Sequence, residues 1–247
     1  GFNNVNPTGT LPVDVIAPTV SSIVYGANDG KLSLGETATL VVTLSEAVNV
    51  TGTPTIALAN GGTASYTGGT GTNTLTFSYT PGANQTTADL ATAAANALVG
   101  TIKDLAGNAV VAAGFNNVNP TGTLAVDVTA PTLSSSTPAD NATAVAVGAN
   151  IVLTFSEAVQ KGAGNIVISN GTDTRTIAVT DSQVTISGNT VTINPTADLQ
   201  ANGAYNVQMA SGVIKDLAGN AYAGISDATT LNFSTVDTIA PTVSSIT

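Results

Sequence analysis

Hydrophobic and polar residues alternate along several short stretches of the chain. In TLTFSYT (residues 74–80), Leu75, Phe77 and Tyr79 share one face of an extended strand, and Thr and Ser residues occupy the other. Because successive side chains of a β-strand point to opposite faces, this period of two predicts a strand with one buried face. The same alternation occurs in TATLVVTL (37–44), NIVLTF (150–155), AYNVQM (204–209) and TLNFST (230–235).

Turn signals separate these stretches. ANGG at 59–62, SNGT at 169–172 and SGNT at 187–190 carry the Asn-Gly and Ser-Gly pairs that are typical of β-hairpin turns. Short alternating strands joined by such turns favour an all-β fold made of antiparallel sandwiches. The Ala-rich segment ADLATAAANAL (88–98) fits a short helix as well as a strand, and the sequence leaves that choice open.

The chain contains an internal repeat. GFNNVNPTGTLPVDVIAPT at 1–19 returns as GFNNVNPTGTLAVDVTAPT at 114–132, SEAV at 45–48 returns at 156–159, and IKDLAGNA at 102–109 returns at 214–221. The spacings between the first residues are therefore 113, 111 and 112 residues. A unit of about 110 residues has the size of an immunoglobulin-like (Ig-like) sandwich.

The repeat defines the expected domain organisation. We expect two tandem domains, residues 14–126 and residues 127–236. Residues 1–13 are expected to be the terminal strand of a preceding repeat, and residues 237–247 the start of the next one. On this interpretation, residues 1–13 are expected either to be disordered or loosely packed, or to add as a strand to a neighbouring molecule.

Composition narrows the classes of function. The chain has 15 acidic and 5 basic residues, with a formal net charge of −10, which argues against nucleic acid and anionic membranes as partners. It has no Cys and no His, which excludes disulfides, Cys nucleophiles, Ser-His triads and thiolate or imidazole zinc sites. No stretch is apolar for long enough to predict membrane insertion.

Several of these motifs resemble a known family. GTPTIAL (52–58), YTGGTGTNTLTFSY (66–79), IKDLAGNA and VDVTAPT resemble the repeated Ig-like modules of giant bacterial surface proteins, including the swarming-motility type of repeat. The stretch that begins APTLSSSTPADNATAVAV at 130 is similar to the bacterial Ig-like domain of surface-layer proteins. The resemblance covers nearly the whole chain. It implies two tandem Ig-like antiparallel β-sandwiches and a secreted or cell-surface location.

Acidic residues recur at equivalent places in the two repeats. In an Ig-like topology, SEAV begins the loop after the second strand, and KDLAGN forms the loop between the last two strands. Both loops emerge at the end of the domain where the first strand begins, directly after the VDV motif. Three carboxylates should therefore meet at one pole of each domain. They are Asp14, Glu46 and Asp104 in the first repeat, and Asp127, Glu157 and Asp216 in the second.

Such a group of carboxylates predicts a cation site. Three negative charges repel one another unless a positive charge lies among them. Calcium binds 6–8 oxygen ligands from carboxylates, amide groups and backbone carbonyls, so we expect Ca²⁺ as the cofactor. Asn108 and Asn220 are candidates for further oxygen ligands, and Gly107 and Gly219 allow a tight turn around the ion. Lys103 and Lys215 are expected to point away from the cluster.

A plainer interpretation stays open for each part of this site. DLAGN also fits a hairpin turn whose Asp and Asn bond to their own backbone, and Glu46 or Glu157 fits a solvated strand end. The other acidic residues are interpreted as structural. Asp89 and Asp198 fit turns or caps, and Asp173, Asp181 and Asp227 fit solvated loop or edge positions.

An enzyme is not expected. The chain has three Glu, no Trp and few aromatic residues, whereas a glycosidase needs paired carboxylates in an aromatic-lined cleft. We expect structural repeats in the stalk of a bacterial adhesin, stiffened by calcium at the junctions and interacting with neighbouring repeats of the same chain. Two alternatives remain open, a module that binds carbohydrate or a cell surface, and a subunit of a self-assembling surface layer or filament.

Overall fold

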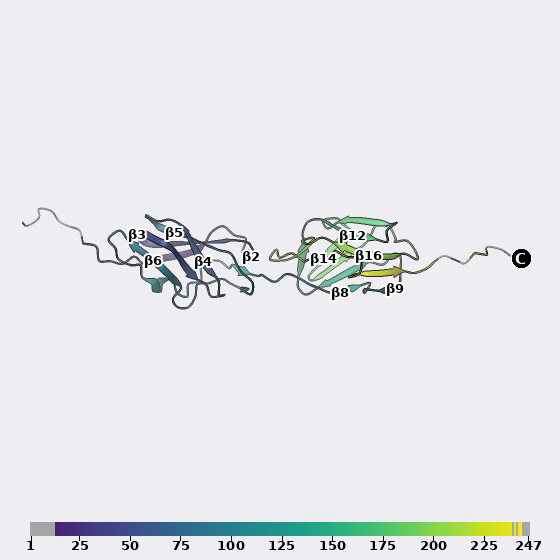
Figure 1. Cartoon of the computed structure of the whole chain (residues 1–247), viewed down its shortest axis with the longest axis horizontal. Coiled ribbons are helices and arrows are strands. Elements are labelled where there is room, and N and C mark those ends of the chain that lie inside the picture. Colours follow the sequence, from purple (N-terminus) through teal and green to yellow (C-terminus); the bar gives the residue numbers. More distant parts are fainter. Residues whose placement is uncertain (1–12, 239, 241, 244–247) are drawn as a thin grey trace, which may run out of the picture. The chain divides into compact units, whose positions relative to one another are not determined.

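The computed structural model describes residues 13–238, 240 and 242–243, and it divides the chain into two compact units (Figure 1). Unit 1 comprises residues 1–128 and unit 2 comprises residues 129–247. The division thus follows Val128, two residues after the boundary expected at Val126. Residues 1–12, expected to form a terminal strand of a preceding repeat, lie outside the described residues. The described residues of 237–247 carry no strand.

Unit 1 consists of one antiparallel sheet and one short pair of parallel strands. A five-stranded sheet contains β1, β3, β4, β5 and β6, and a separate two-stranded sheet pairs β2 with β7 in parallel. The elements are β1 (Val20–Tyr25), β2 (Lys31–Leu32), β3 (Ala38–Ala57), β4 (Thr63–Gly68), β5 (Thr72–Tyr79), β6 (Leu98–Asp104), the 3₁₀ helix η1 (Ala112–Phe115) and β7 (Ala125–Val126).

Strand β3 is 20 residues long and changes partners along its length. Its first part pairs with β1 and β5, and the part from Val48 onward pairs mainly with β6 and β4. The register shifts between Thr43 and Val48, at the SEAV motif. The expectation that SEAV begins a loop is therefore wrong in unit 1. The motif is an irregularity inside a strand, of the kind that bends a strand from one sheet toward the other.

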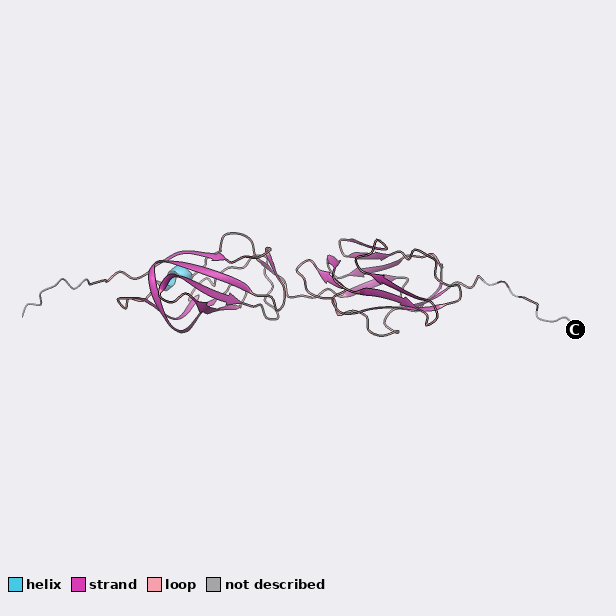
Figure 2. Ribbon diagram, turned by 90° about the horizontal axis from the view of Figure 1, so that it is seen from above, coloured by secondary structure: helices cyan, strands magenta, loops and turns pink. Residues whose placement is uncertain are grey.

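Unit 2 contains two larger sheets and a short ribbon (Figure 2). One sheet has the order β14-β15-β10-β8, the other has the order β13-β12-β16-β18-β9, and β11 pairs with β17. The first three residues of SEAV lie between β10 and β11 here, as expected of a loop, and Val159 begins β11. The strands are β8 (Leu133–Thr137), β9 (Ala142–Val145), β10 (Ile151–Phe155), β11 (Val159–Lys161), β12 (Asn165–Ser169), β13 (Thr174–Ala178), β14 (Val184–Ser187), β15 (Thr190–Ile193), β16 (Ala204–Met209), β17 (Ile214–Asp216) and β18 (Asn232–Thr235).

Each unit buries its own core, and the alternating pattern predicts the buried faces correctly. Leu75, Phe77 and Tyr79 of β5 are buried in unit 1, together with the inward face of β3. In unit 2 the apolar positions of β10, β16 and β18 are buried in the same way. Burial of these apolar faces is the main favourable term in folding, and the polar faces of the same strands stay at the surface. The fold is therefore all-β, with two Ig-like antiparallel sandwiches.

The Ala-rich segment at 88–98 contains no helix. Its residues form bends and isolated bridges, in which Leu58 of unit 1 faces Thr92, before β6 begins at Leu98. The one helix in the described part of unit 1 is η1 at Ala112–Phe115 (Figure 2). Tertiary pairing thus overrides the helical propensity of alanine at this position.

The β4–β5 turn depends on a glycine that has no room for a side chain. Gly69 has φ +107°, and a Cβ built on it would lie 2.0 Å from the carbonyl oxygen of Thr74. Gly71 in the same turn has φ +82°, but a Cβ there would meet no atom within 4 Å. A side chain at Gly69 would therefore meet both a steric clash and an unfavourable backbone conformation, whereas one at Gly71 would meet only the second.

We expect Gly69→Ala to destabilise unit 1 by about 3 kcal/mol, because the new methyl group adds a steric clash to the unfavourable backbone conformation. Gly71→Ala carries only the backbone cost and should destabilise by about 1 kcal/mol. Urea unfolding of both variants measures the difference. Equal effects would contradict the close approach of Thr74.

Candidate metal centre

Three carboxylates converge at one pole of unit 1. One oxygen each from Asp14, Glu46 and Asp104 lies within 4.8 Å of the other two. Asp14 lies in the segment before β1, Glu46 lies inside β3, and Asp104 is the last residue of β6. These are the residues that the sequence predicted to meet.

Backbone pairing explains how the three segments come together. β6 pairs with β3 in a register that places Asp104 opposite Val48, the last residue of SEAV. The segment before β1 is fixed to the same motif by two hydrogen bonds. The Ser45 N–H donates to the Thr19 carbonyl over 2.9 Å, and the Thr19 N–H donates to Ser45 Oγ over 3.0 Å. Ser45 thus positions the chain that carries Asp14.

The Asp104 carboxylate is held within the tight KDLAGN turn. Its Oδ1 accepts the N–H groups of Gly107 (2.6 Å) and Asn108 (2.8 Å), and Gly107 adopts φ +103°. Only 3% of Asp104 is exposed. The hairpin-turn interpretation of DLAGN is therefore correct as a description of the turn. The carboxylate serves that turn and also faces Asp14 and Glu46.

Asn108 connects the turn to the segment before β1. Its Nδ2 donates to Asp104 Oδ2 over 2.7 Å, to the Asp14 carbonyl over 3.1 Å and to the Ile16 carbonyl over 3.4 Å. The amide group therefore binds together the two segments that carry Asp14 and Asp104. The oxygen-ligand role expected for Asn108 and Asn220 stays a prediction.

The pKa values of two carboxylates in the cluster are shifted in opposite directions. Burial, with the negative charges of Asp14 and Asp104, raises the pKa of Glu46 above its ordinary value. Burial alone would also raise the pKa of Asp104, but hydrogen bonds from Asn108 and the turn backbone outweigh it and hold that pKa below its usual range. Lys103 is exposed whereas the neighbouring Asp104 is buried, which places their side chains on opposite faces of β6. Within one cluster, the pKa of Glu46 is therefore raised and the pKa of Asp104 is lowered.

The equivalent cluster recurs in the second repeat, where Asp127, Glu157 and Asp216 also offer oxygens within 4.8 Å of one another. Asp216 is 1% exposed, and its Oδ1 accepts the N–H groups of Gly219 (2.6 Å) and Asn220 (2.8 Å). β17 ends at Asp216 and pairs with β11 at Val159, the last residue of SEAV.

A pair of hydrogen bonds between the Ser of SEAV and the Thr of APT, here called a serine clamp, also occurs in both repeats. It was not predicted from the sequence. Ser156 donates its N–H to the Thr132 carbonyl, and Thr132 donates its N–H to Ser156 Oγ, as Ser45 and Thr19 do in the first repeat. The signal was present, because Ser is the first residue of both SEAV copies and Thr the last of both APT motifs.

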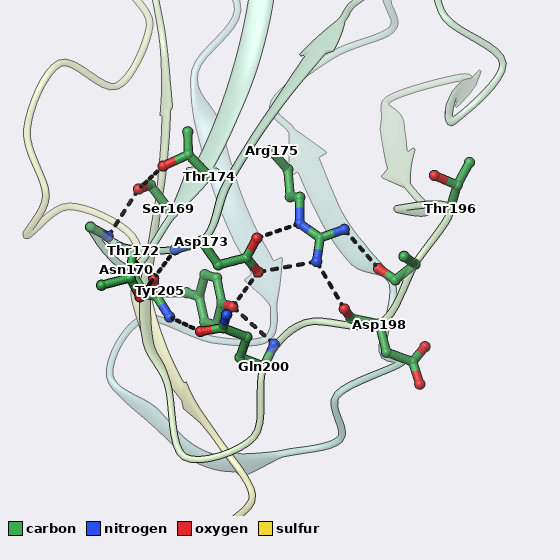
Figure 3. Close-up of polar contacts among 12 residues, drawn as sticks. Ser169, Asn170, Thr172, Asp173, Thr174, Arg175, Thr196, Asp198, Gln200 and Tyr205 are labelled. Atoms are coloured by element: carbon green, nitrogen blue, oxygen red, sulfur yellow. Dashed lines mark hydrogen bonds and ion pairs between the residues drawn. The ribbon is translucent and has the colours of Figure 1, made fainter.

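Two of the acidic residues assigned to solvated positions also accept hydrogen bonds from neighbouring side chains. Asp227 is exposed, as expected, whereas Asp173 is only partly exposed. Figure 3 shows Asp173 paired with Arg175, with Arg175 Nε 2.8 Å from Asp173 Oδ1 and Nη2 3.1 Å from Oδ2. The Tyr205 hydroxyl donates to Asp173 Oδ2 over 2.6 Å. Asp227 accepts hydrogen bonds from the side chains and N–H groups of Thr229 and Thr230, which hold its pKa far below the usual range.

Asp181 and Asp89 also fix turns. The Gln183 N–H donates to Asp181 Oδ1 over 2.9 Å. Asp89 accepts the Leu124 N–H over 3.0 Å and the Asn119 amide over 2.9 Å. Asp89 therefore does more than the turn role expected of it, because it anchors the last segment of unit 1.

Comparison with protein families finds a match in the second repeat. Residues 127–235 match the family model of the bacterial Ig-like domain, so this part of the chain is similar to that family. Domains of this kind are often found in extracellular or surface proteins and are typically structural, non-enzymatic modules. No curated protein matches the chain. Among the described residues, no helix has the length and hydropathy that a membrane span requires.

Proposed function

We propose that the two units are structural repeats in the stalk of a secreted or cell-surface bacterial adhesin, and that calcium bound at their acidic poles stiffens the stalk. One observation supports this most directly. The same set of two Asp and one Glu, with ligand oxygens within 4.8 Å, recurs in both repeats although the interiors of the repeats have diverged. A turn alone would require only the Asp of KDLAGN.

The chemistry of the cluster favours a hard divalent cation. Three carboxylates at this separation repel one another, and burial together with the charges of Asp14 and Asp104 raises the pKa of Glu46. Ca²⁺ accepts several carboxylates and completes its shell with backbone carbonyls and water. A metal bound to Asp14, Glu46 and Asp104 would turn a destabilising contact into a stabilising one.

A bound ion would act on the connecting segments. Asp14 and Asp127 lie in the stretches that precede β1 and β8, whereas their two partners lie in SEAV and in the KDLAGN turn. An ion that joins them fixes the conformation of the connecting stretch on the unit that follows it. In a row of repeats, rigidity is set largely at such junctions, so calcium would restrict bending of the stalk.

The surface of the described residues favours a structural role over sugar binding. Tyr25 and Tyr66 are half-buried, and the other aromatic residues of the described part are buried. Stacking of sugars needs accessible aromatic faces. The chain is therefore proposed to act as a non-enzymatic spacer.

Titration calorimetry and small-angle X-ray scattering test the proposal. We expect the chelator-treated chain to bind Ca²⁺, and we expect calcium to narrow the distribution of distances between the two units. A matched variant with Glu46→Gln and Glu157→Gln should lose both responses. Absence of binding at millimolar calcium would overturn the calcium site, and binding without a change in scattering would overturn the stiffening role.

A further inference from the structure

The first residues of the chain copy a segment that unit 1 buries. Residues 1–13 match residues 114–126 at every position except one, where Pro12 replaces Ala125. Val13 is 80% exposed, whereas its equivalent Val126 is 1% exposed. The chain thus carries two copies of one apolar segment, and unit 1 holds one of them.

The groove that holds residues 114–126 buries several of their apolar side chains. Phe115 and Leu124 are completely buried in the core of unit 1, and Val118 packs against that core. Their equivalents in the first copy are Phe2, Val5 and Leu11. These three apolar side chains are therefore present a second time.

Backbone hydrogen bonds fix the register of the held segment on residues 87–93. The Val126 and Thr87 backbones exchange two bonds, with Thr87 N–H to Val126 carbonyl at 2.8 Å and the reverse bond at 2.9 Å. The Leu90 N–H donates to the Leu124 carbonyl over 2.9 Å. The Thr92 N–H donates to the Val118 carbonyl over 2.9 Å. These bonds involve backbone atoms that residues 5, 11 and 13 also possess.

Polar side chains add further specificity. Asp89 accepts the Leu124 N–H and the Asn119 amide, and the Ala97 N–H donates to Asn116 Oδ1 over 2.9 Å. The equivalents of Asn116 and Asn119 are Asn3 and Asn6. The first copy therefore carries the same polar side chains as the segment that the groove holds.

We propose that this groove of unit 1 is also a docking site for residues 1–13 of a second copy of the chain. Within one chain the exchange is blocked by distance. Residue 13 is followed at once by Asp14 at the carboxylate pole, before β1, whereas the place of residue 126 is beside Leu32 of β2, after β1. The six residues of β1 alone span roughly 20 Å. Docking therefore occurs between copies, by exchange of an identical element.

Pro12 makes docking between copies weaker than closure within one chain. The Ala125 N–H donates to the Gly30 carbonyl over 3.0 Å, and β7 pairs there with β2. Proline has no N–H, so residues 1–13 lose this hydrogen bond. One such bond corresponds to roughly a 2- to 10-fold difference in affinity. Pro12 thus favours the monomer and limits uncontrolled assembly.

Closure within one chain also has the advantage of a high effective concentration. Residues 1–13 should therefore bind the groove of another copy when chains refold together at high concentration. They can do so before residues 114–126 of that copy occupy the groove. Refolding from denaturant in chelator, followed by size-exclusion chromatography with light scattering, tests this without any contribution from calcium. The proposal does not rest on the metal site.

We expect the oligomer fraction of the full chain to rise with protein concentration and to disappear when residues 1–13 are deleted. Pro12→Ala should raise the oligomer fraction, and Leu11→Ala should lower it because Leu124 is completely buried. Ile16→Thr is the matched control. It removes a 72% exposed apolar side chain outside the copied segment and should change nothing.

An introduced disulfide provides a second measurement, because it tests the register in which residues 1–13 dock. The chain contains no cysteine that would compete with the introduced ones. Val126 pairs with Leu32, so a Val13→Cys chain refolded with a Leu32→Cys chain should form a disulfide-linked heterodimer. Oligomers that persist after deletion of residues 1–13 would overturn the proposal. So would the absence of oligomers at every concentration in both the unaltered chain and Pro12→Ala. Oligomers formed by Pro12→Ala but not by the unaltered chain would support docking in the groove, and would show that Pro12 prevents it in the unaltered chain.

Discussion

Replacing Asp173 by alanine should destabilise unit 2 by about 3 kcal/mol. The substitution removes the bidentate partner of Arg175 and the acceptor of the Tyr205 hydroxyl (Figure 3). The side chains of Asp173 and Arg175 are 14% and 25% exposed. The guanidinium and the hydroxyl would therefore lose an anionic partner in surroundings that water reaches only in part.

The Asp173 network also joins three separate segments. Arg175 on β13 donates to the carbonyls of Ala197 (3.4 Å) and Asp198 (3.0 Å), and the Gln200 N–H donates to the Tyr205 hydroxyl of β16 over 2.9 Å. Because Arg175 and Tyr205 hold the pKa of Asp173 below its ordinary value, the stabilisation is present above that ordinary value and is lost as the pH falls through the lowered one.

Asp198→Ala is the matched control for Asp173→Ala. It removes the same charge from a neighbouring exposed position, and it keeps the backbone carbonyl to which Arg175 donates. Figure 3 shows its carboxylate pointing away from the guanidinium. A surface substitution of this kind should change stability by less than about 0.5 kcal/mol. Equal losses from the two substitutions, measured by urea unfolding, would show that the network contributes little.

Glu46→Gln should stabilise unit 1 in the absence of calcium and destabilise it, relative to the unaltered chain, when calcium is present. In chelator at neutral pH the variant should melt at a higher temperature than the unaltered chain, because it removes one of three charges that repel one another. With calcium the order should invert. A site saturated at about 100 times its dissociation constant stabilises the native state by about 2.7 kcal/mol, and the variant should lose most of this gain.

Two comparisons isolate the cause of this reversal. Glu36→Gln makes the same chemical change at an exposed residue of unit 1 that accepts the Ser33 N–H, and it should show no reversal. The advantage of Glu46→Gln in chelator should also shrink as the pH falls through the raised pKa of Glu46. Protonation then removes the same charge from the unaltered chain. Calorimetric melting of the chains with and without calcium measures both trends, and an unchanged order of stability would contradict the metal site.

The predicted strands were reliable where one face of the strand is buried. Leu75, Phe77 and Tyr79 were placed correctly because alternation is a local property of a half-buried strand. SEAV was misplaced in unit 1, where it lies inside β3 instead of in a loop. Whether a strand ends or bends at such a motif depends on its partners β5 and β6, which are distant in the sequence.

The candidate metal centre was predictable because repetition marked it. SEAV and KDLAGN recur at a nearly constant spacing, and a fold with fixed loop positions brings them to one pole. The roles of Asp173 and Asp89 were not predictable in this way. Their partners Tyr205 and Asn119 lie about 30 residues away, and no motif connects them.

The sequence by itself determined the all-β class, the two repeats, the buried faces and the six carboxylates of the two clusters, because period, repetition and residue type are properties of the chain itself. Only the tertiary structure decided the path of β3, the serine clamps, the Arg175 network and the groove that holds residues 114–126. These features are contacts between distant segments, and their geometry depends on how several strands pack together at once.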